Sequence, residues 1–154
     1  MPRVSSGVFP VYNNEFKVGT NGRSSAAADM KTIADMVSFS VSINGNVEEW
    51  TPMTTEGWVR RLMTGKGFSI TLSGKRNIGD DGNDYLAGMK FKTGQDANTK
   101  FEWVMPDGTT IAFDCVVNIT TDGGESTDVN ALEAEILSDG KPTVTPPSSS
   151  SSQE

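Results

Sequence analysis

The 154-residue chain contains no histidine and only one cysteine. Without histidine, it lacks the commonest general base and the commonest metal ligand of proteins. Cys115 has no partner for an intramolecular disulfide, which fits a reducing compartment, and a catalytic thiol would need a histidine beside it. We therefore expect Cys115 to be a small buried side chain, and we assign no catalytic, cofactor-binding or metal-binding residue and no enzymatic activity.

Clustered positive charge and long apolar runs are also missing. The chain has 13 Lys and Arg against 20 Asp and Glu, a net charge of −7. This acidic balance argues against a phosphate-binding surface and against adhesion to anionic membranes. No apolar run reaches the ~18 residues of a membrane span, and the first residues lack the apolar core of a signal peptide. The sequence predicts a soluble protein made in the cytoplasm, with no cofactor, no membrane contact and no specific DNA binding.

Alternating apolar residues occupy residues 98–119, on both sides of the turn Pro106-Asp107-Gly108. Period-two apolarity around a short turn predicts a long β-hairpin. Pro106 sets φ at the first turn position, and Gly108 can take a positive φ at the bulge that follows. The alternating residues are Phe101, Trp103, Met105, Ile111, Phe113, Cys115, Val117 and Ile119.

Further strands are predicted elsewhere in the chain. Apolar residues alternate with serine over residues 37–43, up to Asn44-Gly45, and again over residues 68–73; residues 89–92 resemble a short strand. Residues 128–139 fit either a helical stripe or a strand alternating with glutamates, and we favour a strand because most of the chain has β character. The chain is therefore predicted to be mainly β.

A helix is predicted over residues 54–64, within the segment 51–65. Trp58 and Leu62 share one helical face, which we expect to pack on the sheet, while Glu56 and Arg60 form a favourable pair one turn apart. Gly65-Lys66-Gly67 follows the helix and precedes a strand. This order indicates a helix C-cap and not a phosphate-binding loop. Of the three tryptophans, only Trp50 is expected to be exposed; Trp58 and Trp103 are expected in the core.

Two groups of carboxylates permit a functional and a structural interpretation. The run Asp80, Asp81, Asn83 and Asp84 could bind Ca²⁺, but it lacks EF-hand spacing, so we favour a turn that caps a short helix. Glu102 and Asp114 could lie on one face of the hairpin as a glycosidase pair. We favour a solvated polar face for them.

The chain divides by composition into three parts. Residues 1–29 are poor in large apolar residues and are predicted to form an extended N-terminal arm, whose first 14 residues become ordered on assembly. Residues 30–145 form the β domain. Residues 146–154 are rich in serine and are predicted to be disordered.

Five segments, in order, resemble the tail tube (major tail) proteins of long-tailed bacteriophages and of phage-like elements of Gram-positive bacteria. Together they span most of residues 15–145. They are EEWTPM at 48–53, EGWVRRLMTGKGFSITLSGKRN at 56–77, GDDGNDYLAG at 79–88, MPDGTTIAFDCVVNIT at 105–120 and SDGKPT at 138–143.

The resemblance implies a β-sandwich or barrel with one flanking helix and a long hairpin. It implies hexameric rings that stack into a hollow tube in the virion tail, through which genomic DNA passes into the host without specific binding. Implied partners are further copies of the chain and the tail tape-measure, terminator and baseplate or initiator proteins. The alternative is a virion-associated carbohydrate-binding or adhesion β-sandwich, which would favour several exposed aromatic residues in one patch.

Overall fold

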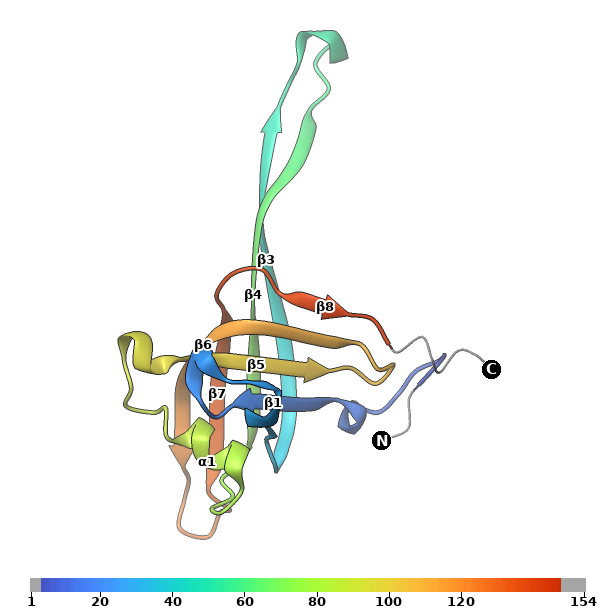
Figure 1. The fold of residues 1–154 in the computed structure, drawn as a ribbon. Helices are drawn as coiled ribbons and strands as arrows, with labels where there is room; N and C mark the ends of the chain where they lie inside the picture. Colours follow the sequence, from blue (N-terminus) through green and yellow to red (C-terminus); the bar gives the residue numbers. More distant parts are fainter. Residues whose placement is uncertain (1–3, 148–154) are drawn as a thin grey trace.

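The computed structural model describes residues 4–147 and is built on one antiparallel sheet (Figure 1). Mainly β architecture is what the sequence predicts. The strands are β1 (Glu15–Gly19), β2 (Met30–Thr32), β3 (Met36–Trp50), β4 (Arg60–Lys75), β5 (Asn98–Val104), β6 (Thr110–Gly123), β7 (Ala131–Ser138) and β8 (Thr143–Thr145). Single turns of 3-10 helix lie at Val11–Asn13, Gly22–Ser24, Ala27–Asp29, Met53–Thr55 and Gly94–Ala97.

The sheet folds over on itself to enclose one core. Its strand order is β2-β1-β5-β6-β7-β4-β3, and β8 pairs with the first residues of β6. The rings of Phe16 on β1 and Phe39 on β3 nevertheless lie 4.8 Å apart, although four strands separate β1 from β3 in the sheet. The two halves of the sheet therefore face each other as a sandwich. The core residues include Val18, Ile70, Leu72, Phe101, Phe113, Cys115, Val117, Leu132, Ala134 and Ile136.

The predicted hairpin at residues 98–119 is confirmed. β5 and β6 pair in register from Asn98↔Val116 to Val104↔Thr110, and Gly108 takes φ +97° in the turn. The strand favoured for residues 128–139 is also confirmed, since β7 alternates buried and half-buried residues between β4 and β6. In these segments, alternation in the sequence reports directly which face of the strand meets the core.

The one α-helix within residues 4–147, α1 (Asp81–Ala87), begins where the acidic run predicts a capped turn. The Asp80 carboxylate caps the helix by accepting from the Asn83 backbone N–H, and a second backbone N–H, from Ala34, reaches the same oxygen. Leu86 and Ala87 enter the core from this helix. The flanking helix of the fold is therefore α1.

The predicted arm over residues 1–29 is wrong from Glu15 onward. β1 lies between β2 and β5, and its Phe16 and Val18 are buried in the core. Arg23 holds the following loop to the sheet, because its guanidinium donates to the Thr99 and Cys115 carbonyl oxygens. The low content of large apolar residues was misleading here, because two of them, Phe16 and Val18, are enough to attach the five-residue strand β1 to the core. The predicted serine-rich tail falls largely outside the described residues.

Two smaller predictions fail as well. Residues 89–92 form turns and not a strand. Asn44-Gly45 does not end a strand, because β3 continues to Trp50 and stays paired with β4 along this length. Gly65-Lys66-Gly67 consequently lies inside β4 and caps no helix.

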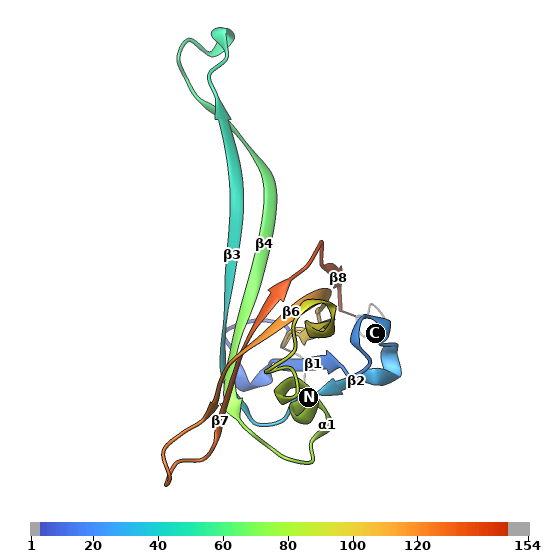
Figure 2. The ribbon, with the colours of Figure 1, turned by 90° about the vertical axis from the view of Figure 1, so that its left-hand side faces the viewer.

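The predicted helix at 54–64 is wrong, because this segment is the far end of the β3–β4 hairpin. Residues 53–55 form one turn of 3-10 helix, and β4 begins at Arg60. Glu56 and Gly57 both take positive φ, of 54° and 95°, which reverses the chain and prevents an α-helix. Figure 2 shows the hairpin rising far above the rest of the molecule.

Candidate interaction surface

The distal part of the β3–β4 hairpin has no other strand beside it among residues 4–147. β7 covers the edge of β4 only from Ser69 onward, and no described strand pairs with the outer edge of β3. We call residues 43–68 the distal hairpin. Such a two-stranded ribbon is marginal in isolation and leaves unpaired backbone donors and acceptors on both edges.

One face of the distal hairpin continues the apolar face of the core. Val41 pairs with Ile70 at the core, Ile43 pairs with Phe68 above it, and Val47 pairs with Met63 further out. Gly45 lies between the last two pairs, and a Cβ there would come within 2.8 Å of the Met63 sulfur. The missing side chain lets Met63 lie across β3, so an apolar strip runs outward from the core.

The end of the hairpin carries further exposed apolar side chains, which we call the tip. Met53 is 98% exposed and Trp58 is 78% exposed, although Trp58 is predicted to be buried. Trp50 is exposed as predicted, with the Arg60 guanidinium 5.7 Å from its ring centre. Val59 and Leu62 complete the tip. Exposed residues of this size in one place mark an interaction site more often than a free surface.

A groove of about 750 Å³ lies at the base of the hairpin, where β3 and β4 leave the body. We call it the basal groove. Its walls come from both strands of the β3–β4 hairpin, from the turn end of the β5–β6 hairpin, and from β8 with the segment before it. The apolar lining residues are Val41, Ile43, Phe68, Trp103, Ile111, Pro142 and Val144, and the charged ones are Lys66 and Lys141.

The acidic run at α1 serves the fold. Asn83 is fully buried, and its side-chain oxygen accepts from Arg76 and from the Asn77 backbone N–H. Its amide donates to the carbonyl oxygens of Ala34 and Lys75. The Arg76 guanidinium bonds the Asp84 carboxylate at 2.8 Å and, with the Gly79 N–H, holds the pKa of Asp84 below its ordinary value.

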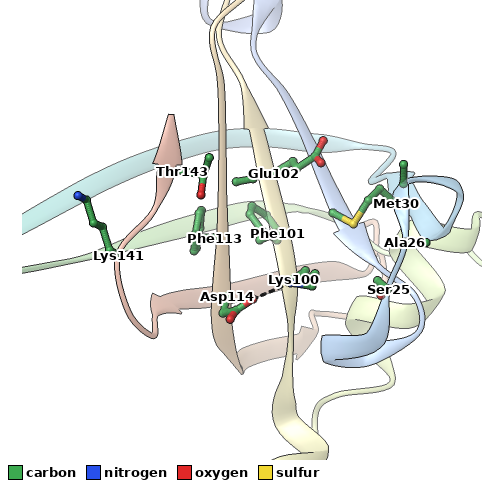
Figure 3. Close-up of a pocket in the computed structure, with 12 residues that line it drawn as sticks. Ser25, Ala26, Met30, Lys100, Phe101, Glu102, Phe113, Asp114, Lys141 and Thr143 are labelled. Atoms are coloured by element: carbon green, nitrogen blue, oxygen red, sulfur yellow. Dashed lines mark hydrogen bonds and ion pairs between the residues drawn. The ribbon is translucent and has the colours of Figure 1, made fainter. Parts of the chain in front are cut away.

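The carboxylates Glu102 and Asp114 do share a face of the β5–β6 hairpin, as predicted. They line a shallow groove of about 430 Å³ on the outer side of the sheet, between Met30 on one side and Thr143 on the other (Figure 3). Asp114 is ion-paired with Lys100, directly opposite it in the register, at 3.0 Å. The arrangement is that of a paired polar strand face.

Cys115 is buried, as predicted, and burial raises the pKa of its thiol to about 12. Among residues 4–147, no three His, Cys, Asp or Glu side chains are grouped so that they could hold a metal ion. Within the same range, no helix has the length and apolar character to cross a membrane.

Sequence comparison identifies no matching family model and no matching curated protein. Structural comparison, in contrast, finds clear neighbours. A chain of the tail of an empty GTA particle, described with C6 symmetry, superimposes with a TM-score of 0.68 at 17% identity, over 90% of this chain and 99% of that one. A chain of the virion of a native gene transfer agent (GTA) particle gives 0.66 at 16% identity over the same shares. The predicted fold class, a mainly β tail-tube-like domain with one helix, is thereby confirmed.

Proposed function

We propose that this protein is the structural subunit of a tail tube, in which six copies form a ring and rings stack into a hollow conduit. The observation that carries the proposal is the distal hairpin, whose apolar strip and tip are left exposed by the described residues 4–147 of the same copy. The similarity to a chain of a C6-symmetric tail supports the same assembly.

Burial of the hairpin gives the physical drive for assembly. Removing apolar surface from water is favourable by roughly 25 cal/mol per Å², and this gain is set against the entropy that association costs. The exposed side chains of the strip and tip therefore favour a buried state, which other copies of the chain can supply. The free edge of β3 adds backbone groups that a neighbouring strand can pair with, and a closed ring would leave no edge open.

An acidic subunit suits a conduit for DNA. With a net charge of −7, the tube presents few sites that attract phosphate, so DNA can pass along it without being held. The expected further partners are the tape-measure, terminator and baseplate or initiator proteins, and the expected location is the tail of a virion or phage-like particle. Origin from a Gram-positive host stays a prediction from the sequence resemblance.

A second candidate, adhesion to carbohydrate, draws on the two exposed tryptophans of the distal hairpin. Trp50 and Trp58 both lie on the surface near the tip, and indole rings can stack on sugars. Arg60 lies against Trp50 and could bond sugar hydroxyls, but Met53, Val59 and Leu62 make the rest of the tip apolar. A mainly apolar tip favours a protein partner over a glycan.

Negative-stain electron microscopy of the purified protein over a range of concentrations tests the proposal, alongside light scattering. We expect six-membered rings or stacked tubes, with a mass that rises with concentration. Strict monomers at every concentration, even after mixing with assembled tails, would contradict it. Retention of such monomers on a glycan array, lost in Trp58→Ala, would support the adhesion candidate instead.

A further inference from the structure

We infer that the hairpin tip of one copy docks into the basal groove of another copy. The inference rests on the proposed self-association and adds which two surfaces meet. The tip, at residues 50–62, and the groove, at the base of the same hairpin, are different surfaces. A contact between them is therefore head-to-tail, the kind that generates rings and open stacks.

The groove requires an apolar occupant. It is walled by Phe68 at the base of the hairpin, by Trp103 and Ile111 from the body, and by Val144 from β8. Trp103 is fixed in place, because its indole N–H donates to the Asn14 side chain at 2.9 Å and its ring stacks 6.2 Å from Phe16. The groove is thus a firm apolar surface on which a partner side chain can settle without rearrangement.

The tip supplies side chains of the matching kind. Met53 and Trp58 are the two most exposed apolar residues of the hairpin, and they flank the reversal at Glu56-Gly57. A buried indole removes about 150–250 Å² from water, and methionine adapts to irregular surfaces. Together they form a narrow apolar wedge of the kind that serves as a hot spot in protein interfaces.

A copy cannot fill its own groove with its own tip. Ile43 lies at the groove and Trp50 at the tip, and seven strand residues at about 3.3 Å each place them about 23 Å apart. β3 and β4 stay paired along this length, so the hairpin does not fold back (Figure 2). A second copy has to provide the occupant.

Charge supports the same pairing. Lys66 and Lys141 flank the groove, and neither forms an ion pair in the part of the chain that the structure describes. Glu56, at the turn of the tip, is exposed and also lacks an ion pair there. A docked tip brings this carboxylate to the lysines, which fixes its orientation as well as adding attraction.

The N-terminal segment is the competing occupant, since Val8 and Tyr12 are exposed. This segment is already attached to its own body, however. The Val4 N–H donates to the Pro106 carbonyl oxygen at 2.9 Å, and Phe9 lies against Met105 and Pro106. The tip has no such attachment, so it is the better occupant.

Disulfide trapping in the full chain tests the contact. Thr54→Cys places a thiol on the tip without removing Met53 or Trp58, and Val144→Cys places one in the groove. The native Cys115 is fully buried and adds no background. Under mild oxidation of assembled protein, the double variant should give a ladder of covalent oligomers, and an equal mixture of the single variants should give dimers only.

Two control variants sharpen the test. Thr54→Cys with Phe91→Cys places the second thiol on an exposed turn after α1, and should give no ladder. Trp58→Ser added to the trapping pair should lower the yield at least about tenfold, as loss of a hot-spot residue does. Glu56→Lys should weaken trapping, and Lys141→Glu in the same chain should restore it.

The outcomes separate the two proposals. Tubes in the microscope without a ladder would overturn the tip-in-groove contact and leave the tube function standing. A ladder from Tyr12→Cys with Val144→Cys, in place of the tip pair, would identify the N-terminal segment as the occupant. A wild-type protein that never associates would overturn both.

Discussion

At the scale of single residues, Asn83 shows how a buried polar side chain holds the fold together. It is fully buried, and its oxygen and its amide together make four hydrogen bonds that join α1 to the loop after β2 and to the end of β4. Buried polar groups of this kind are costly only when a partner is lost. Its role is to hold the helix against the sheet.

Asn83→Ala should therefore destabilise the protein strongly. Removal of the side chain leaves the carbonyl oxygens of Ala34 and Lys75 and the Asn77 N–H without this partner, so the free energy of unfolding should fall by about 2–4 kcal/mol. Urea denaturation measures the change. Asn118→Ala, at an exposed position on β6, is the matched control and should lie within about 0.5 kcal/mol of wild type.

Asp84 gives the fold a sensitivity to acid. Hydrogen bonds from Arg76 and the Gly79 N–H lower the pKa of this carboxyl in the folded state. A group whose folded pKa is depressed contributes stability at higher pH and loses it as the pH falls through that pKa. Melting temperature should drop on acidification below about pH 4, and Asp84→Asn should flatten that drop. Asp96→Asn is the control, because Asp96 is exposed and forms no ion pair with another described residue; an equal flattening there would contradict the role of Asp84.

At the scale of elements, the two halves of the β3–β4 hairpin have different tasks. Near the body, Ile70 and Leu72 on β4 lie in the core, while Leu62 near the tip is exposed. One strand thus passes from a folding role to an interaction role within ten residues. A buried leucine and an exposed leucine on the same strand allow the two roles to be separated by experiment.

Leu72→Ala should lower the free energy of unfolding by about 2–5 kcal/mol, because it opens a cavity in the core. Leu62→Ala should leave it within about 0.5 kcal/mol of wild type and should weaken assembly instead. Thermal denaturation of the monomer and sedimentation of the assembled form measure the two effects. A large loss of monomer stability in Leu62→Ala would show that the tip packs on its own chain.

The hairpin also explains which elements the sequence could predict. Alternation identifies β5, β6 and β7 because their apolar residues face this chain's own core. Trp58 and Leu62 are four residues apart and therefore match the spacing of a helical face. In the structure, however, both side chains are exposed at the tip of the hairpin and do not pack on the core. The skipped register between Asn46 and Val47 further breaks the period-two pattern. Pattern analysis assumes that every apolar face is covered within one chain, and the hairpin violates that assumption.

The candidate site was only partly accessible from the sequence for a related reason. Trp50 is identified as exposed because charged residues precede it, whereas the basal groove is assembled from β3, β4, β5, β6 and the segment before β8. No local pattern reports that these segments meet. Met53 stands alone in a polar stretch just before the helix predicted at 54–64, and its near-complete exposure could only come from the three-dimensional structure.

At the scale of the whole molecule, we expect net charge to govern how the proposed tube acts on DNA. Seven excess negative charges per copy, repeated around the proposed ring, would give a strongly acidic particle. We expect no measurable binding of duplex DNA by the assembled protein in a fluorescence titration at low salt, where electrostatic attraction would be strongest. Salt-sensitive micromolar binding would contradict this expectation. A strongly basic protein such as lysozyme, at equal concentration, serves as the positive control.

In the tip-in-groove contact that we infer, the separation of tip and groove on one chain gives any open series of copies two unlike ends. One end always displays unfilled grooves, and the other always displays bare wedges carrying Met53 and Trp58. Growth is then directional, since an incoming copy makes a different contact at each end. A protein that starts the polymer and a protein that stops it need opposite shapes: one has to offer an apolar hollow, and the other an apolar projection. A single partner with one surface could not serve at both ends.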